Sequence, residues 1–415
     1  MTDGSEMEKI VDNGNRKIAW AKRNMPVLSI LERTFREEQP FRGLRIAVSV
    51  HVEAKTACLA LMLEQGGADV SLTGCNPLST QDDVAAALAA RGMKVFCKHG
   101  ADPALYRRHL VETLSCVPHL VIDDGGDLAE LLHTSHTDLG REIIGGCEET
   151  TTGVHRLRIL EREGKLRYPC LAVNDARCKH LFDNRFGTGQ SVWTAIMSAT
   201  NLVVAGKHVV VAGFGMCGKG VALRAKGLGA HVIVTEVDSV MACEAMMEGY
   251  TVLPMSEAAP IGDVFVTVTG CNDVITKEHF SVMKDGAILS NAGHFDVEVN
   301  IRELSEAAVE EREVRAGVDG YRMPDGRWLY LLAKGRLVNL AAGDGHPAEI
   351  MDMSFSLQAL SAAHMALHGR TLENKVYDLP PALDTRVAEL LLESKAMQID
   401  HLTPEQEFYI GNWSI

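Results

Sequence analysis

The sequence predicts an α/β protein that contains two parallel, doubly wound sheets. Short runs of β-branched residues alternate with segments of helical period along almost the whole chain, which is typical of βαβ units. The alternation begins again near residue 190, where a Gly-rich turn follows the first strand of the second series. With 415 residues, the chain is long enough for two or three domains.

Five strands are expected in the first half, separated by helical segments that would cross over between parallel strands. They cover residues 43–50, 69–74, 93–98, 119–124 and 170–175. His51, Asn76 and Asp124 come at or directly after strand ends. One such residue is usually a turn or helix cap, but ligands of open α/β sheets bind where the carboxyl ends of strands meet. Several polar strand ends therefore indicate a site.

The second series supplies the strands of a second sheet. They cover residues 207–212, 231–238, 250–255, 263–270 and 286–293. After about residue 340 the chain becomes helical, with its longest helix expected over 351–369. No stretch reaches 18 unbroken apolar residues, so no membrane span is expected.

Charge and cysteine content narrow the class of protein. Lys and Arg number 41 against 55 Asp and Glu, giving a net charge of −14 that does not attract nucleic acid or anionic lipid in general. Neither is an expected partner, although a small basic pocket stays open. The ten cysteines show no zinc-site or redox spacing, so we expect no metal and a reducing compartment. The N-terminus shows no signal pattern, which favours the cytoplasm.

A dinucleotide-binding fingerprint occupies the Gly-rich turn. Gly213, Gly215 and Gly218 follow a buried-type strand and open a helix, and Glu236 ends the next strand. These glycines permit a tight turn, close approach of a pyrophosphate and close helix–strand packing, while the carboxylate accepts ribose hydroxyls and disfavours a 2′-phosphate. A Gly-rich turn without a ligand is the alternative. The full context favours an NAD site.

Nine segments, the Gly-rich turn among them, share one resemblance. They are HVEAKTA (51–57), NPLSTQDDVAAAL (76–88), DDGGDL (123–128), EETTTGVHRL (148–157), VNDARCKHLFDNRFGTGQS (173–191), VAGFGMCGKG (211–220), GHFDVE (293–298), GRLVNLAAGDGHP (335–347) and EIMDMSF (349–355). In this order they resemble the S-adenosylhomocysteine hydrolase (adenosylhomocysteinase) family. HVEAKTA is similar to a short-tailed subgroup, from archaea and some thermophilic bacteria, that includes S-inosylhomocysteine hydrolases.

The resemblance implies reversible hydrolysis of S-adenosyl-L-homocysteine to adenosine and L-homocysteine. NAD is used catalytically: the ribose 3′-hydroxyl is oxidised, C4′ loses a proton, homocysteine leaves, water adds and the hydroxyl is restored. A temporary ketone makes the elimination easy where direct attack on a C–S bond is hard. A conventional NAD-dependent dehydrogenase and a catalytically silent NAD-binding protein are the rival classes.

The resemblance also implies catalytic residues. Lys179, Asp183 and Asn184 match the family group that handles the 3′-hydroxyl proton, and the i, i+4 spacing of the first two permits contact on a helix. A surface ion pair is the alternative. His51 and Asp124 match the acid–base pair at C4′ and C5′, and His294 matches a histidine near the nicotinamide.

Binding residues follow by the same match. Those expected to bind substrate are Glu53, Lys55, Thr56, Ser79, Gln81, Glu149, Leu337, Leu340, Asp344, His346, Met351 and Phe355. Those expected to bind NAD are Thr150, Thr151, Thr152, Asn184, Gly213, Phe214, Gly215, Met216, Cys217, Gly218, Glu236, Thr269, Gly270, Asn272, Ala292, Gly293, His294, Asn339 and His346.

The sequence departs from the family where the base is read. Glu53 and Lys55 replace Thr and Glu or Gln, and Asp344 replaces Met, which makes that wall more polar. A lysine can only donate, so Lys55 and Glu53 together could pair with either adenine or hypoxanthine. S-inosyl-L-homocysteine is therefore the alternative substrate. An outward-facing Glu53–Lys55 salt bridge is the other interpretation.

Two further departures concern the cofactor and the assembly. Thr188 stands where longer relatives have a Cys, and the tail ends at NWSI without the extension that reaches a neighbouring subunit's NAD site. NAD is therefore expected to exchange more readily. The resemblance implies a homotetramer or homodimer, a discontinuous doubly wound substrate domain (1–186 and 343–385), a Rossmann NAD-binding domain (187–342) and a short C-terminal segment (386–415).

Overall fold

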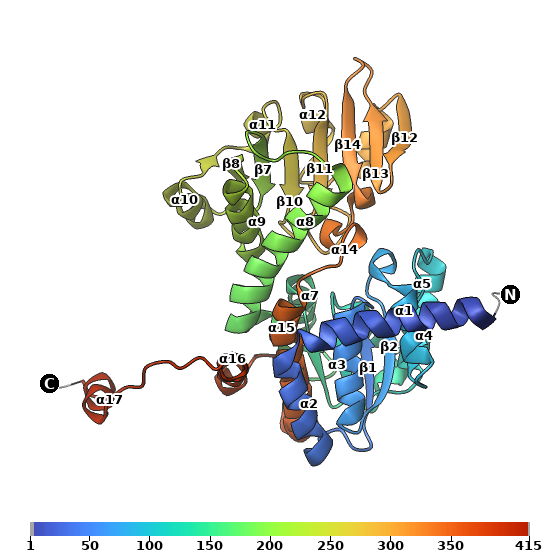
Figure 1. The fold of residues 1–415 in the computed structure, drawn as a ribbon, viewed down its shortest axis with the longest axis vertical. Helices are drawn as coiled ribbons and strands as arrows, with labels where there is room; N and C mark the ends of the chain where they lie inside the picture. The colour runs from blue at the N-terminus through green and yellow to red at the C-terminus, as the bar shows by residue number, and fades with distance from the viewer. Residues whose placement is uncertain (1–3, 414–415) are drawn as a thin grey trace.

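The computed structural model describes residues 4–413, and Figure 1 shows that they form two lobes. The first lobe contains a parallel seven-stranded sheet in the order β15-β6-β5-β4-β1-β2-β3. Its strands are β1 (Arg45–Ser49), β2 (Asp69–Thr73), β3 (Lys94–Phe96), β4 (Leu120–Asp123), β5 (Gly145–Glu148), β6 (Cys170–Ala172) and β15 (Val376–Asp378). Because β15 follows the second lobe in sequence, the first lobe is discontinuous.

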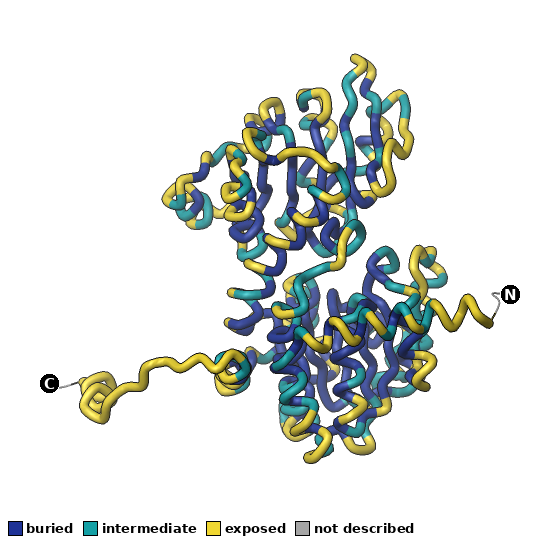
Figure 2. Tube along the Cα trace, viewed as in Figure 1, coloured by how far each residue is buried: buried dark blue, intermediate teal, exposed yellow. Residues whose placement is uncertain are grey.

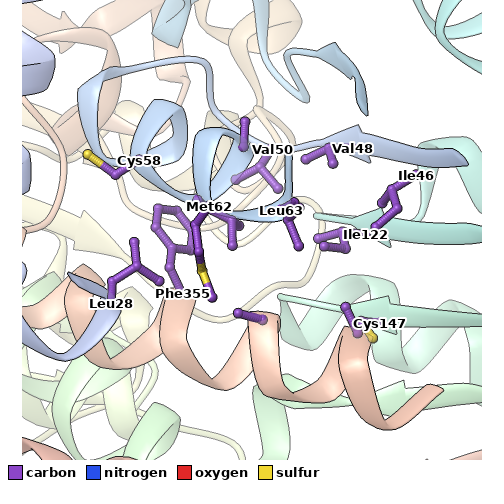
Figure 3. Packing of buried hydrophobic residues seen from close by; sticks show 14 of the residues in the cluster. Leu28, Ile46, Val48, Val50, Cys58, Met62, Leu63, Ile122, Cys147 and Phe355 are labelled. Carbon is purple, nitrogen blue, oxygen red and sulfur yellow. The ribbon is translucent and has the colours of Figure 1, made fainter. Parts of the chain in front are cut away.

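Helices cover both faces of this sheet, as a sheet buried on two sides requires. They are α1 (Gly4–Arg23), α2 (Pro26–Glu38), α3 (Ala54–Gln65), α4 (Asp82–Ala89), α5 (Pro103–Leu114), α6 (Asp127–His133), α7 (Thr151–Arg162), α15 (Ala348–His368) and α16 (Pro381–Ser394). In Figure 3, Phe355 of α15 packs beside Leu28 and Met62 from α2 and α3. The helix that follows the second lobe thus lies in the core of the first.

The second lobe contains an eight-stranded sheet in the order β12-β13-β14-β11-β10-β7-β8-β9. Its parallel strands are β7 (His208–Ala212), β8 (His231–Thr235), β9 (Thr251–Val252), β10 (Val264–Thr267), β11 (Ala287–Asn291) and β14 (Trp328–Leu332). An antiparallel edge is added by β12 (Glu310–Arg315) and β13 (Val318–Arg322). The helices are α8 (Thr188–Thr200), α9 (Met216–Gly227), α10 (Ser239–Met247), α11 (Met255–Ala258), α12 (Lys277–Phe280), α13 (Ile301–Ala307) and α14 (Val338–Ala341).

All of the expected strands form, and the sheets also contain strands that the sequence did not predict. The β5 strand contains two glycines and a glutamate, and β12 carries five charged residues among six, so neither shows an apolar run. The expected strand at 250–255 shortens to β9. Each of these unexpected strands forms because neighbouring strands in the folded sheet supply its hydrogen-bond partners, which local composition does not reveal.

The chain crosses between the lobes twice, through a π-helical segment (Lys179–Gly187) and again ahead of α15. We propose that the substrate domain extends through α16, because the expected limit at residue 385 falls inside this helix. Val387 and Leu390 of α16 are buried in the first lobe's core. Beyond it, α17 (Pro404–Gly411) projects from the body and is exposed along its length (Figures 1 and 2).

Among residues 4–413, no helix combines the length and the apolar character needed to cross a bilayer.

Candidate active site

The topology of both sheets directs polar strand ends into one cavity. In the first sheet the strand order reverses between β1 and β4, and in the second it reverses between β7 and β10. Ligands of open α/β sheets bind at such switch points. A cavity of about 610 Å³ joins them, lined by residues of both lobes, including His51 after β1, Asp124 after β4 and Thr269 after β10.

Two histidines from different lobes flank one carboxylate. Asp124 Oδ2 lies 3.5 Å from His51 Nε2, and Asp124 Oδ1 lies 3.8 Å from His294 Nδ1. One ligand-type atom of each residue lies within 4.8 Å of the others. Gly125, at φ 107°, permits this approach, because a Cβ there would overlap His294 Nε2. The turn therefore needs a glycine where the two lobes meet.

Hydrogen bonding fixes which nitrogen of His51 carries a proton. Ser79 Oγ donates its single hydrogen to the carbonyl of Asn76, at 2.9 Å. The tautomer that satisfies both contacts has His51 Nδ1 donating to Ser79 Oγ, 2.6 Å away. The lone pair of Nε2 is left on the side of Asp124 and the cavity. The arrangement presents a neutral imidazole with a free basic nitrogen.

Burial keeps this imidazole uncharged. Desolvation lowers the pKa of His51 to about 4, and the opposing attraction of Asp124 does not restore it. His51 can therefore accept a proton at neutral pH without first having to lose one. This is the protonation state that a general base requires.

A second ionic group lies in the same cavity. Lys179 Nζ lies 2.7 Å from Glu149 Oε1 and 2.8 Å from Asp183 Oδ2, and His346 Nδ1 lies 3.0 Å from Asp183 Oδ1. Lys179, Glu149 and Asp183 are all buried. Ser354 and Gln358 of α15 donate to Asp183 and Glu149 respectively, so the helix from beyond the second lobe completes the group.

The start of the segment that carries Lys179 is capped from a distance. Asp384 of α16 accepts hydrogen bonds from the backbone N–H groups of Arg177, at 2.9 Å, and Cys178, at 3.0 Å. Unpaired N–H groups at a helix start favour such a carboxylate. The i, i+4 contact between Lys179 and Asp183 forms as expected. Because both residues are buried, it is not a surface ion pair.

Lys179, Asp183 and Glu149 differ in how their surroundings shift their pKa values. Burial opposes the ammonium of Lys179, but Asp183 and Glu149 outweigh it and raise the pKa of Lys179 above its ordinary value. Burial also opposes the carboxylate of Asp183, but Lys179 and His346 hold its pKa well below the usual range. Burial raises the pKa of Glu149 to about 7, with Lys179 opposing. Glu149 is thus the member closest to exchanging a proton at neutral pH.

The Gly-rich turn fits a dinucleotide. Gly213 has φ 100°, a Cβ on Gly218 would overlap the Gly213 carbonyl, and a Cβ on Gly215 would meet nothing within 4 Å. The first turn of α9 thus opens to an approaching pyrophosphate. Glu236 lies beside it, where its carboxylate accepts from Phe214 N at 2.6 Å. Asn339 also lines the cavity, and its Oδ1 is buried and has no hydrogen-bond partner among the described residues.

Glu53 and Lys55, the pair expected to read the base, are buried and line the cavity, so their contact with a base stays a prediction. Glu53 caps α3 by accepting from the N–H groups of Lys55 and Thr56, and its Oε2 lies 2.9 Å from Lys55 Nζ. The salt bridge exists, but both residues are buried instead of facing outward. Lys55 Nζ also donates to the Asp344 carbonyl at 2.7 Å, while the residue Asp344 is exposed. Lys55 makes the wall of this cavity polar, whereas Asp344 lies with Glu53 and Lys55 in the lining of a neighbouring cavity.

Most expected site residues line the cavity. They are His51, Glu53, Lys55, Thr56, Asp124, Glu149, Thr150, Thr151, Thr152, Lys179, Asp183, Asn184, Gly215, Met216, Cys217, Thr269, Gly270, Ala292, Gly293, His294, Leu337, Asn339, Leu340, His346, Met351 and Phe355.

The other expected residues lie outside its lining. They are Ser79, Gln81, Asp344, Gly213, Phe214, Gly218, Glu236 and Asn272. Gln81 and Asp344 line a neighbouring cavity of about 740 Å³, Ser79 supports His51, and the glycines shape the turn. Asn272 is exposed and donates to Asp273, and its expected NAD contact stays a prediction.

Sequence reasoning missed several lining residues, including Asn174, Asp175, His155 and His180. Asn174 is buried, and its Oδ1 accepts from Thr151 and from Asn184, at 3.3 Å each. It thereby connects two expected cofactor contacts. Its position at the carboxyl end of the expected strand 170–175 was the signal that could have identified it.

These features define an enzyme with a Rossmann NAD-binding lobe whose cofactor turn faces a buried acid–base site. Two family models match: S-adenosyl-L-homocysteine hydrolase over residues 6–139, and S-adenosyl-L-homocysteine hydrolase, NAD binding domain, over residues 184–345. The chain belongs to the S-adenosyl-L-homocysteine hydrolase family and carries its NAD-binding domain.

Curated relatives cover nearly the full chain. S-inosyl-L-homocysteine hydrolase of Methanocaldococcus jannaschii is 54% identical, with 96% of each chain covered. Adenosylhomocysteinase of Pyrococcus abyssi is 54% identical (97% and 96% covered), and that of Thermotoga maritima is 52% identical (97% and 100% covered). Relatives of both names are equally similar, so overall identity does not distinguish the two bases.

Proposed function

We propose that the chain catalyses reversible hydrolysis of S-adenosyl-L-homocysteine to adenosine and L-homocysteine through a transient 3′-ketone of the ribose. The observation that carries this proposal is the presence of two separate proton-transfer groups, Lys179–Glu149–Asp183 and His51–Asp124–His294, in the cavity that the Gly-rich turn faces. Hydride transfer alone needs one such group, whereas oxidation followed by elimination needs two.

Bound NAD supplies the acceptor for the 3′ hydride and returns that hydride at the end. Lys179 donates to the 3′ oxygen and stabilises its developing negative charge, because its neighbouring carboxylates keep it protonated. The hydroxyl proton passes into the Lys179–Glu149–Asp183 group, in which Glu149 has the proton affinity closest to neutrality. Asn339 Oδ1 and the N–H groups at the start of α9 would hold the cofactor.

The second group acts once the ketone has formed. The neutral His51, with Nε2 free, and Asp124 are placed to take the acidified C4′ proton. His294 lies on the other side of Asp124, where it can protonate the leaving sulfur and later orient water. Closure of the lobes around these groups excludes bulk water from the reactive ketone.

Replacing Lys179 with Ala tests the oxidation step. The variant should fail to develop the near-ultraviolet absorbance of the reduced cofactor when the thioether is added, and homocysteine release should fall at least about a hundredfold. The exposed Lys165→Ala is the matched control. Undiminished activity in the Lys179 variant would contradict the assigned role. Stoichiometric reduced cofactor with each turnover would instead identify a conventional dehydrogenase.

S-inosyl-L-homocysteine is the second candidate substrate. Because the Glu53 carboxylate already accepts from two N–H groups and from Lys55, it has little capacity left for an adenine amino group. Lys55 retains a third N–H, which suits the O6 acceptor of hypoxanthine. A side-by-side assay of homocysteine release from the two thioethers assigns the base, and release from neither overturns the reaction.

We also propose a cytoplasmic homodimer or homotetramer. All ten cysteines are free thiols, which supports a reducing compartment. The C-terminal arm (residues 396–413) carries exposed apolar residues, including Phe408, Tyr409 and Ile410, which support association.

A further inference from the structure

An arginine of the first lobe reaches a phenylalanine of the second. The guanidinium of Arg156, on α7, lies 4.7 Å from the ring centroid of Phe295, in the loop after β11. Its Nη1 also donates to the carbonyl of Gly125, at 3.0 Å, and lies 3.1 Å from Asp127 Oδ1. One planar cation thus contacts groups on both sides of the junction between the lobes.

Each loop that Arg156 contacts carries an acid–base residue next to the contact. Gly125 follows Asp124, and Phe295 follows His294. The Phe295 ring contacts both the Arg156 guanidinium and the His294 ring, whose centroid is 4.7 Å away at an interplanar angle of 82°. Asn291 Nδ2 donates to the Phe295 carbonyl at 2.8 Å, so the loop itself is fixed to the end of β11.

We propose that Arg156 is a positioning residue that latches the two lobes together and keeps His294 against Asp124. The inference rests on the proposed function for its kinetic consequences, but the latch itself is a contact between lobes. Asp127 and the Gly125 carbonyl both hold Nη1 of the guanidinium, so its stacking face stays directed at Phe295. A lysine offers neither the planar face nor the fork.

The latch has a distinctive kinetic signature. A half-exposed cation–π contact is worth a fewfold to about tenfold in an equilibrium constant, so its loss should lower the ratio of closed to open molecules by that factor. Apparent affinity falls with the fraction of competent molecules, so KM should rise by up to the same factor. Because lobe opening also releases product, kcat should stay level or increase. General damage to the fold would instead lower kcat.

The test compares Arg156→Met, Arg156→Lys, Phe295→Leu and the double variant Arg156→Met/Phe295→Leu, all loaded with NAD. The matched control is Arg162→Met, an exposed arginine at the end of the same helix. Steady-state kinetics with both thioethers and small-angle X-ray scattering are measured for each. We expect both single changes at Arg156 and the change at Phe295 to raise KM and the radius of gyration, and the double variant to resemble the worse single variant.

Additive effects in the double variant, or an Arg156→Met protein with wild-type KM and radius of gyration, would overturn the latch. If wild-type protein releases homocysteine from neither thioether, the proposed function fails, and scattering alone still decides the latch. An expanded Arg156→Met protein beside an unchanged Arg162→Met protein would then support it, and equal radii would refute it.

Discussion

Glu149 shows how one buried carboxylate can set the pH range of a site. Its pKa is about 7, raised by burial, whereas the pKa of His51 is about 4 and that of Asp183 lies well below the usual range. Of these three, Glu149 is therefore the group that changes charge near neutrality. At a pH below the pKa of Glu149, this carboxyl group is neutral, and Lys179 loses one of the two negative charges that hold its ammonium group.

We expect kcat/KM to fall as the pH drops through about 7. In Glu149→Gln, kcat/KM should be lower at pH 8 and should show no acid limb near 7, because the titrating group is gone. The pH profile of kcat/KM from 5.5 to 9 checks this. An acid limb that survives unchanged in the variant would assign it to another group.

Asp123 provides a prediction about stability. Burial raises its pKa from 3.8 to about 8, with the N–H of Ala129 opposing. Between those values the folded state holds a proton that the unfolded state has lost, so stability falls as pH rises, by up to about 1.4 kcal/mol per pH unit. Asp123→Asn should flatten the dependence of the free energy of unfolding on pH between 5 and 8.

Urea unfolding at several pH values measures that slope. Asp69→Asn, which removes an exposed carboxylate at the start of β2, is the control and should leave it unchanged. A slope in Asp123→Asn as steep as that of the wild type would contradict the prediction.

At the scale of elements, residue patterns predicted those parallel strands that are continuous β-branched runs, but not the parallel strands β5, β14 and β15. The capping of the Lys179 segment by Asp384 could not be predicted, since 206 residues separate Asp384 from Cys178. Ser79 was expected to touch substrate, and only the coordinates show that it orients His51. Motifs thus identified residues that gather in the cavity, whereas their supporting contacts depend on tertiary placement.

Two remote caps can be compared directly. Asp384 caps the segment that carries Lys179, and Asp352 caps α2 through the N–H groups of Val27 and Leu28. Asp384→Ala and Asp352→Ala should each lower the free energy of unfolding by about 1–2 kcal/mol. Only Asp384→Ala should also reduce kcat, because only that cap positions Lys179. Equal kcat values in both variants would show that the segment holds its place without the cap.

At the scale of the whole molecule, the C-terminal arm projects away from the two lobes (Figure 1). Phe408, Tyr409, Ile410 and Trp413 are all more than 60% exposed, and the arm contacts little of its own body (Figure 2). Apolar side chains gathered on one projecting segment usually mark an interface. We expect them to be covered by a second copy of the chain.

A chain that ends at Lys395 tests this expectation. It should keep the thermal midpoint of the body within a few degrees, since α16 remains, but show a smaller mass by light scattering and faster loss of NAD on dilution. A truncated protein with the mass of the full-length assembly would exclude the arm from the interface.

The return of the chain to the first lobe has a consequence for its synthesis. Strand β6 lacks its outer neighbour β15, and the core lacks α15, until the entire second lobe has left the ribosome. At roughly 5–20 residues per second, the roughly 160 residues between Gly187 and Ala348 take about 8–30 seconds to make. During that interval the second lobe can fold alone, while the first exposes an unpaired strand edge that invites aggregation. The lobe that is begun first is therefore the lobe that is completed last.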